Sequence, residues 1–478
     1  MNYRMIFHTL GAVLSCLAAL MLLPLLAGLC YGENVLAFVI AIGITAAVSV
    51  FLRSFKPKST DIYAREGFVI VGLAWISMSL LGALPFVISG QIPNYIDAVF
   101  ETVSGFTTTG ASILTDIESM SHACLFWRSF THWIGGMGVL VFVMAVLPMS
   151  GEHSMHIMRA EVPGPTVGKL VPRAKETAKI LYLMYMALTA LETIFLKAGG
   201  MNFFDALLHA FGTAGTGGFS TKAASVGAFN SLYVEMVISV FMLLFSVNFN
   251  LYYLLLIGRI KDVLKNEELR WFLAIVGFAV LTIALNITGM YGSFSTALRH
   301  AFFNVSTIIS TTGFGTVDFS LWPEYSKWLL LLLMFIGACA GSTGGGIKVS
   351  RLITLLKSAS AELRQMIRPR SVTRVQLEGK RVETGAVHAV STFFAMYVMI
   401  LLVCTLLISL DGFDMETNFT GSLACLSNIG PGMSLVGPTG NYSHFSAFSK
   451  LVLSLAMLIG RLEIYPILLL FNRHTWKR

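Results

Sequence analysis

Between two long apolar runs, and directly after an amphipathic segment at 297–309, the chain reads Ser310-Thr311-Thr312-Gly313-Phe314-Gly315. Three weaker copies each lie in a less hydrophobic stretch between two hydrophobic runs. They read Thr107-Thr108-Thr109-Gly110-Ala111, Gly215-Thr216-Gly217-Gly218-Phe219 and Ser427-Asn428-Ile429-Gly430-Pro431. The central glycines are 95 to 117 residues apart. A motif that recurs at such intervals indicates an internal repeat, so the chain is predicted to hold four copies of one unit.

The composition is typical of a protein embedded in a membrane. Of the 478 residues, 55% are hydrophobic and 12% are charged, and the mean hydropathy is +0.75. Soluble domains carry about 25% charged residues. Apolar runs such as 68–89 and 387–410 reach the ~20 residues that cross a bilayer. Membrane lipid is therefore the expected surrounding, and the net charge of +8 is interpreted as an orientation signal, with no nucleic acid as partner.

The repeat pattern divides the chain into five predicted parts. Residues 1–60 form an N-terminal transmembrane hairpin, followed by repeats at 61–165, 166–262, 263–370 and 371–478. Each repeat contains a span, a short pore helix, a glycine motif and a second span. The expected fold is an all-α polytopic membrane protein with four pseudo-symmetric helix–pore-helix–filter–helix (M1-P-M2) repeats around a central pore, plus the N-terminal hairpin. This organisation gives ten spans.

The short helices are predicted at 96–106, 203–213, 297–309 and 416–426. A polar residue stands thirteen positions before each central glycine, near the expected start of the helix. These residues are Asp97, Asp205, His300 and Thr417. Acidic side chains complement the positive N-terminal end of a helix dipole. The negative ends of the four helices are then expected to point towards the ion path.

Basic residues alternate with the glycine motifs along the chain. They gather at 53–66, 151–179, 259–270 and 351–381. By the positive-inside rule these loops are cytoplasmic, which places the glycine motifs towards the opposite side and both termini in the cytoplasm. The loops serve orientation alone or also dock a cytoplasmic partner, and the sequence leaves both interpretations open.

The glycine motifs predict a filter for a monovalent cation. A ring of backbone carbonyls can replace the hydration shell of a small cation, and glycine adopts the backbone angles that this needs. No Asp or Glu lies within three residues of a central glycine, whereas a divalent site would need carboxylates. The candidate filter residues are Thr108, Thr109, Gly110, Thr216, Gly217, Gly218, Thr311, Thr312, Gly313, Asn428, Ile429 and Gly430.

The second span of repeat three is interrupted by the glycine-rich segment 337–346. Each glycine in a helix costs ~1 kcal/mol relative to alanine, so this segment is not expected to be helical. A phosphate-binding loop would need Gly-Lys-Ser/Thr after a strand, and Ile347 breaks that pattern. Close helix packing through small residues is a second alternative. The favoured interpretation is an intramembrane gate below the filter.

Arg461 lies inside the last apolar run. An intramembrane arginine usually faces a cavity or a partner. It either places a positive charge in the pore or pairs with Glu463 or with carbonyls to fix helix packing. The candidate gate residues are Gly341, Ser342, Thr343, Gly344, Gly345, Gly346, Lys348 and Arg461.

Over nearly its whole length the chain resembles the Trk/Ktr/HKT superfamily of potassium transporters, and most of all the bacterial Trk-type potassium uptake membrane subunit (TrkH/TrkG-like). The hairpin and the four glycine motifs carry the resemblance, with Trp127-Arg128-Ser129-Phe130-Thr131-His132-Trp133-Ile134-Gly135-Gly136-Met137-Gly138 and Gly460-Arg461-Leu462-Glu463. Sodium-preferring plant relatives often have serine at the position of Gly110, so glycine there implies K⁺ preference. The ring is uneven, because Gly217 replaces a larger residue and Pro431 follows Gly430.

The resemblance also implies partners and a location. It implies a homodimer, a cytosolic RCK-type nucleotide-binding regulatory ring (TrkA-like), and a multi-pass position in the bacterial plasma (inner) membrane. It further implies that the glycine-rich segment is the gate. K⁺ is the transported ion, and no organic cofactor is expected in this chain.

The expected function is potassium uptake through a gated pathway driven by the membrane potential, which supplies ~2.3 kcal/mol per charge at 100 mV. A K⁺ symporter coupled to H⁺ or Na⁺ and a Na⁺-permeable or non-selective pathway are alternatives. An enzyme is not expected, because the histidines are scattered without a catalytic pattern. The six cysteines show no metal-binding or redox spacing and are interpreted as free thiols. A receptor or scaffold with a vestigial pore is a third class.

Overall fold

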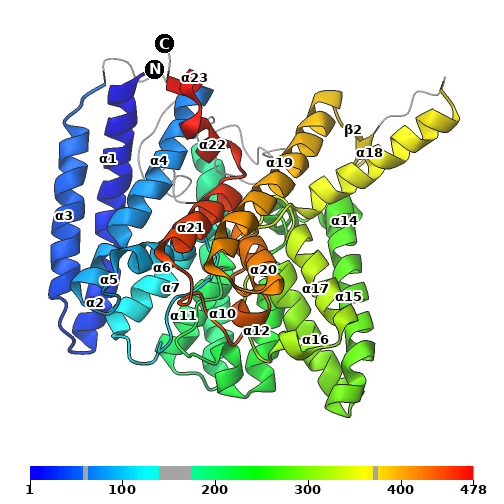
Figure 1. The fold of residues 1–478 in the computed structure, drawn as a ribbon, viewed down its shortest axis with the longest axis horizontal. Helices are drawn as coiled ribbons and strands as arrows, with labels where there is room; N and C mark the ends of the chain where they lie inside the picture. Colours follow the sequence, from blue (N-terminus) through cyan, green and yellow to red (C-terminus); the bar gives the residue numbers. More distant parts are fainter. Residues whose placement is uncertain (58–62, 139–173, 370–374, 477–478) are drawn as a thin grey trace.

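The computed structural model describes residues 1–57, 63–138, 174–369 and 375–476. The chain in these ranges is almost entirely helical (Figure 1). Its only strands there, β1 (Gln376–Leu377) and β2 (Lys380–Arg381), form a small antiparallel hairpin. The predicted all-α class is confirmed. Parts of the basic loops lie outside the described residues, namely Lys58, Arg159, Lys169, Arg173, Arg370 and Arg374.

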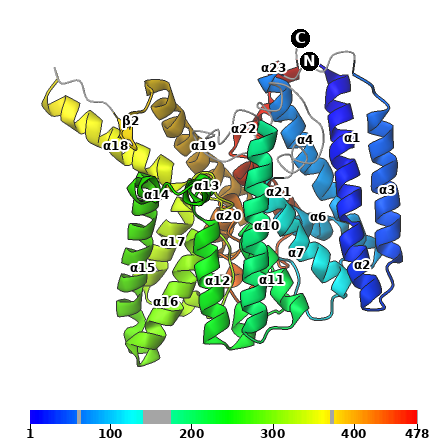
Figure 2. The ribbon, with the colours of Figure 1, turned by 180° about the vertical axis from the view of Figure 1, so that it is seen from behind.

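The N-terminal hairpin stands at one edge of the molecule, where two long helices lie side by side in Figures 1 and 2. It contains α1 (Tyr3–Leu20), α2 (Leu22–Cys30) and α3 (Leu36–Arg53). Gly11 lets α1 and α3 approach closely, because a Cβ there would lie 2.8 Å from the carbonyl oxygen of Ser49. The hydroxyl of Ser49 in turn donates to the carbonyl of Gly11 at 2.7 Å.

The first helices of the four predicted repeats are long and apolar. They are α4 (Ala64–Gly82) continued by α5 (Leu84–Ile88), α10 (Ala174–Ala198), α15 (Glu267–Tyr291) and α19 (Thr384–Ile408). These four and the two spans of the hairpin are the six helices, among the described residues, that are long and apolar enough to cross a membrane. The chain is therefore a multi-pass membrane protein.

The four short helices form close to where the sequence predicts them. They are α6 (Tyr95–Phe106), α11 (Phe203–Gly215), α16 (Phe294–Ile309) and α20 (Met415–Leu426). Asn94, Asn202 and Asp414 cap three of them by accepting from amides of the first turn. The expectation for His300 is wrong: α16 begins about two turns earlier, at Phe294, so His300 lies in its middle instead of near its start.

The second helices are shorter than predicted, or broken. They are α7 (His122–Gly136), α12 (Leu232–Phe245) with α13 (Phe249–Leu256), α17 (Glu324–Ile336) with α18 (Val349–Ile367), and α21 (Ala447–Arg461) with α22 (Tyr465–Phe471). The α12–α13 pair bends by 92° and would be a seventh span if counted as one. Only the break after α17 was predicted, so the count of ten spans does not correspond to ten unbroken helices. Residues beyond 138, which would complete the second span of repeat one, lie outside the described ranges.

The remaining elements are short. They are α14 (Ile260–Lys265), α23 (Arg473–Trp476) and the 3₁₀ turns η1 (Ser225–Phe229), η2 (Phe319–Leu321), η3 (Ser409–Asp411) and η4 (Ser434–Val436). Both termini lie at the same end of the molecule (Figure 1), and the Tyr3 hydroxyl donates to the carbonyl of Trp476 at 3.1 Å.

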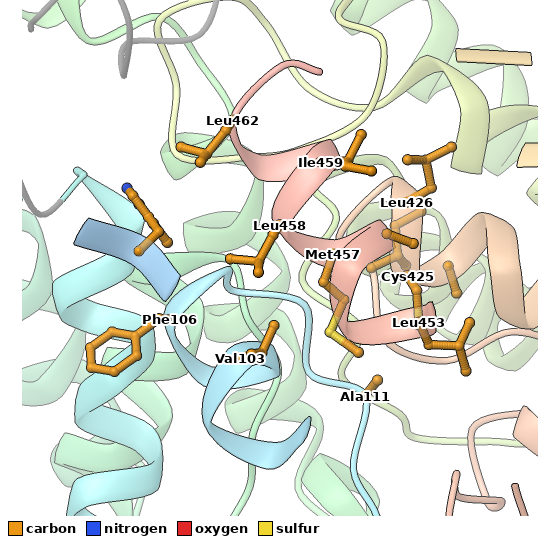
Figure 3. Packing of buried hydrophobic residues seen from close by; sticks show 14 of the residues in the cluster. Val103, Phe106, Ala111, Cys425, Leu426, Leu453, Met457, Leu458, Ile459 and Leu462 are labelled. Atoms are coloured by element: carbon orange, nitrogen blue, oxygen red, sulfur yellow. The ribbon is translucent and has the colours of Figure 1, made fainter. Parts of the chain in front are cut away.

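The core brings the fourth repeat against the first. Buried side chains of α21, among them Met457 and Leu458, lie between α6, which carries Val103, and α20, which carries Cys425 (Figure 3). Burial of such side chains is worth about 1.5–3 kcal/mol each in water, but lipid is itself apolar, so close packing contributes more here. The contact closes the chain of repeats into a ring.

Candidate functional site

The four short helices end in the same backbone turn. The residue two positions before each central glycine has a left-handed backbone, with φ between 54° and 60°, at Thr108, Thr216, Thr311 and Asn428. The amide of the following residue donates, at 2.8–2.9 Å, to the carbonyl five positions earlier. These bonds are Thr109 to Ser104, Gly217 to Gly212, Thr312 to Thr307 and Ile429 to Ala424. This is the Schellman termination of a helix, in which glycine usually takes the left-handed position. Four non-glycine residues share it here, so the four copies have one local geometry.

Each central glycine has a positive φ, between 79° and 93°, at Gly110, Gly218, Gly313 and Gly430. A Cβ on any of them would also come within 3.0 Å of a carbonyl oxygen of the next repeat. The pairs are Gly110 with Gly217, Gly218 with Thr312, Gly313 with Ile429, and Gly430 with Thr109. These contacts run from the first repeat to the fourth and back to the first. The four motifs therefore form a closed ring in which only glycine fits.

One cavity is lined by all four central glycines, Gly110, Gly218, Gly313 and Gly430. It has a volume of about 90 Å³ and continues among the loops that follow the motifs. Its wall near the ring offers neutral backbone groups, which suit a monovalent cation. A larger apolar pocket, between α17 and α20, shares none of the four glycines with this cavity.

Side chains next to the ring are mostly satisfied by their neighbours. The Thr109 hydroxyl is 2.8 Å from that of Thr107 and accepts from the Asn428 amide at 2.9 Å. The Thr311 hydroxyl accepts from the amide of Gly345 at 2.6 Å. In contrast, the buried hydroxyl of Thr108 has no hydrogen-bond partner among the described residues. That oxygen remains available to a ligand.

The glycine-rich segment lies directly against the motifs of repeats three and four. The amide of Gly346 donates to the carbonyl of Ser427 at 3.0 Å, and a Cβ on Gly344 would lie 2.9 Å from the carbonyl oxygen of Ser310. The Thr343 hydroxyl donates to the carbonyl of Phe245 at 3.1 Å. The segment is non-helical, as predicted, and it packs closely against both motifs through its glycines.

Two buried cationic side chains bind this segment through its carbonyls. The guanidinium of Arg461 donates to the carbonyls of Thr343 at 2.8 Å and Gly136 at 2.7 Å, and also to that of Gly135. The ammonium of Lys348 donates to the carbonyl of Gly344. Pairing with carbonyls, one of the two interpretations of Arg461, is therefore what the structure contains.

Other charged residues at the site were not predicted as site residues, although Glu463 was considered as a partner of Arg461. Glu463 forms an ion pair with Arg351, in the first turn of α18, at 2.5 Å. Glu268 accepts from the amide of Ala340, in the glycine-rich segment, and from that of Ser350, in the first turn of α18. Arg128 and Glu101 form an ion pair behind the ring at 2.6 Å. All lie in or beside apolar runs, where a charge is costly, and that is the signal that could have identified them.

The histidines near the ring make structural contacts. His132 Nδ1 lies 2.7 Å from the carbonyl of Gly105, and its ring packs on Phe219 with centroids 4.1 Å apart. His209 contacts the carbonyl of Asp205 and the hydroxyl of Ser220 at 2.7 and 2.9 Å. No group of three metal-binding side chains occurs among the residues that the structure describes.

Known proteins resemble this chain over its whole length. A family model described as the TrkH cation transport protein matches residues 32–477. The chain is 37% identical to proteins called Trk system potassium uptake protein TrkH from Salmonella typhimurium and from Escherichia coli K12, with 100% of each chain covered. A crystal structure of the potassium transporter TrkH from Vibrio parahaemolyticus is similar, with 34% identity, a TM-score of 0.89 and 100% of both chains covered.

Proposed function

Because this chain belongs to the TrkH family of cation transport proteins, we propose that it takes up potassium across the bacterial plasma membrane through the ring of glycine motifs. It is a transporter and not an enzyme. The ion is the cargo, and the membrane potential drives it inwards, with ~2.3 kcal/mol per charge at 100 mV. The curated relatives are named as parts of a Trk potassium uptake system.

The closed cycle of glycine–carbonyl contacts carries this proposal. The carbonyls of Thr109, Gly217, Thr312 and Ile429 each directly precede a central glycine, and each lies against the central glycine of a neighbouring repeat. Four neutral oxygens can replace water around a weakly bound monovalent cation. The ring contains no carboxylate, which would favour a divalent ion. The unpartnered hydroxyl of Thr108 adds an oxygen next to this ring.

The gate, in this proposal, is the glycine-rich segment with Arg461 and Lys348. The segment contacts the motifs of repeats three and four, and the two cationic side chains add positive charge beside it. A cation below the ring meets both obstacles. Opening therefore requires the segment to leave its contacts with Thr311 and Ser427.

The finer assembly belongs to the same proposal. Both termini and α18 lie at the same end of the molecule (Figure 1), which we assign to the cytoplasm because the basic loops of the sequence alternate with the glycine motifs. A homodimer and a cytosolic nucleotide-binding regulatory ring are proposed from the family alone. Such a ring would act on the basic cytoplasmic loops.

The test is uptake of K⁺ or Rb⁺ into liposomes that hold the purified protein, with Na⁺ as competitor. Wild type should show K⁺-selective uptake. Gly110→Ser should lose selectivity, because its Cβ would collide with the Gly217 carbonyl and displace it from the ring. Gly90→Ser is the matched control, since Gly90 also has a positive φ of 73° but nothing lies within 4 Å of an added Cβ.

A silent wild-type protein has two explanations, a closed gate or a wrong function. Deletion of residues 340–345 separates them, because it removes the proposed obstruction and leaves the ring residues in place. Selective uptake by the deletion variant would support the proposal. Silence of that variant too, in correctly folded protein, would refute it.

A further inference from the structure

A buried ion pair stands behind the ring of glycine motifs. The Nε atom of Arg128, in α7, lies 2.6 Å from Oε1 of Glu101, in α6, and the two side chains are 2% and 0% exposed. A buried pair contributes little net stability, because removing two charges from water costs about as much as their attraction returns. Stability alone therefore gives no reason for charges at this position.

The other donors of Arg128 hold the two loops that follow the motifs of repeats one and two. One guanidinium nitrogen donates to the carbonyl of Ser220 at 3.0 Å, and another donates to the hydroxyl of Ser112 at 3.1 Å. Ser112 and Ser220 each stand two residues after a central glycine. The guanidinium also lies over the ring of Phe219, 3.6 Å from its centroid.

Glu101 completes the connection on its own side. It accepts from the Ser112 hydroxyl at 2.9 Å and from the amide of Ile113 at 3.0 Å. The backbone of Ser112 also joins repeat one to repeat four, because its carbonyl accepts from the amide of Tyr442 at 2.8 Å. The ion pair thus holds the loop after the first motif against repeat two, and the same loop is bonded to repeat four through its own backbone.

At the neighbouring seam, the described loops after the motifs are joined by hydrogen bonds without a charged partner, and the ion pair between repeats two and three, Arg299 with Glu235 at 2.6 Å, lies between α16 and α12. Repeats two and three meet through the amide of Gly227, which donates to the carbonyl of Gly315 at 3.1 Å, and through the amide of Gly315, which donates to the Ser225 hydroxyl at 3.2 Å. Gly315 also stands two residues after its central glycine. Equivalent positions are therefore bonded at both seams. Between repeats one and two, the fork of one guanidinium joins Ser112 to Ser220, and the amide of Ala223 also donates to Glu118 at 2.9 Å.

We propose that Glu101 and Arg128 are a positioning pair that sets the discrimination between K⁺ and Na⁺. The inference rests on the proposed function and adds a determinant outside the ring. Na⁺ is smaller than K⁺, so a ring that relaxes inwards accommodates it better. By holding the loops after Gly110 and Gly218 outwards, the pair keeps the carbonyl of Gly217 at the spacing that suits the larger ion.

The experiment compares three variants by Na⁺ competition against Rb⁺ uptake in liposomes. Arg128→Lys keeps the charge, but a single ammonium cannot reproduce a planar fork that reaches three acceptors. The double variant Arg128→Met with Glu101→Leu removes both charges and avoids leaving one of them buried and unpaired. Arg299→Lys is the matched control, because the guanidinium of Arg299 binds Glu235, away from the motifs. The ratio of the two ions does not depend on how much protein is reconstituted.

We expect Arg128→Lys to reduce K⁺ over Na⁺ selectivity about tenfold, which corresponds to 1.4 kcal/mol, and Arg299→Lys to leave it unchanged. The double variant should recover the melting temperature but not the selectivity. Wild-type selectivity in Arg128→Lys, or in the double variant, would overturn the inference, and if Arg128→Lys does not fold the double variant alone decides. A wild-type or gate-deleted protein without K⁺ selectivity would instead contradict the proposed function.

Discussion

Removal of the Glu268 carboxylate is expected to open the gate. Glu268 lies in the first turn of α15 and is 6% exposed. Its Oε1 atom accepts from the amide of Ala340 at 2.8 Å and from that of Ser350 at 3.0 Å. The first amide belongs to the glycine-rich segment and the second to the first turn of α18. One oxygen therefore joins the glycine-rich segment to the start of α18.

The size of the effect follows from these two bonds. A hydrogen bond to a charged group is worth about 1.5–3 kcal/mol. If both bonds are present only when the gate is closed, their loss in Glu268→Ala favours the open state by about 3 kcal/mol at the lower limit. At 1.4 kcal/mol per factor of ten, this raises the ratio of open to closed protein roughly 150-fold. Glu268→Gln keeps an oxygen that can accept from both amides, so its effect should be smaller, because neutral acceptors bind less strongly.

The assay is K⁺ uptake into liposomes without any regulatory subunit, normalised to the amount of folded protein. The expected order of uptake is Glu268→Ala, then Glu268→Gln, then wild type. The melting temperature of each variant controls for general damage. Uptake by Glu268→Ala that is no greater than that of the wild type, at an unchanged melting temperature, would refute the role of this carboxylate in holding the gate closed.

Two further predictions concern packing and the ring. Gly460→Ala should lower the melting temperature, because an added Cβ would overlap the Leu426 carbonyl and cost about 1–3 kcal/mol of overpacking. Gly43→Ala is the control and should not lower it, since Gly43 has open space around it. Equal melting temperatures for the two variants would contradict the prediction. Tyr442→Phe removes the hydroxyl that donates to the Gly430 carbonyl at 2.7 Å, a hydrogen bond worth about 1 kcal/mol. In the Na⁺ competition assay this loss should change K⁺/Na⁺ selectivity about fivefold. Unchanged selectivity would exclude this contact as a determinant.

The repeats could be predicted because their signals are local. A capping residue such as Asn202 stands directly before its short helix, and a glycine follows the end of each one, so three of the four helices were placed to within two residues. The third was placed too short at its start. No side chain caps α16 at Ser293, and the helix extends outwards because it packs along α15.

The breaks in the second helices could not be predicted, because distant contacts stabilise them. Between α12 and α13 there is neither proline nor glycine. The bend is held by the glycine-rich segment, since the amide of Cys339 donates to the carbonyl of Ser246 at 3.1 Å and the amide of Phe249 donates to that of Gly341 at 3.0 Å. The local sequence pattern does not indicate a contact with residues some ninety positions away in the chain.

The last helix breaks in a similar way. Ile464 has φ 71° and ψ −55°, a strained conformation for a β-branched residue, and the amide of Tyr465 closes a tight turn onto the carbonyl of Glu463 at 2.8 Å. The carboxylate of Glu463 is held by Arg351. Strain of about 1–3 kcal/mol persists only where surrounding contacts enforce it, and here the contact comes from α18, the helix that follows the glycine-rich segment.

The contact of Gly345 with Thr311 connects the proposed gate to the ring itself. With the segment in this position, the Thr311 hydroxyl accepts a hydrogen bond from Gly345, whereas the equivalent hydroxyl of Thr108 has no partner among the described residues. Movement of the segment away from the ring breaks that bond and leaves the Thr311 oxygen free as well. In the proposed gating, a ring with the segment displaced would therefore offer an ion one more available oxygen than the ring with the segment in place, and opening would change ion binding as well as access.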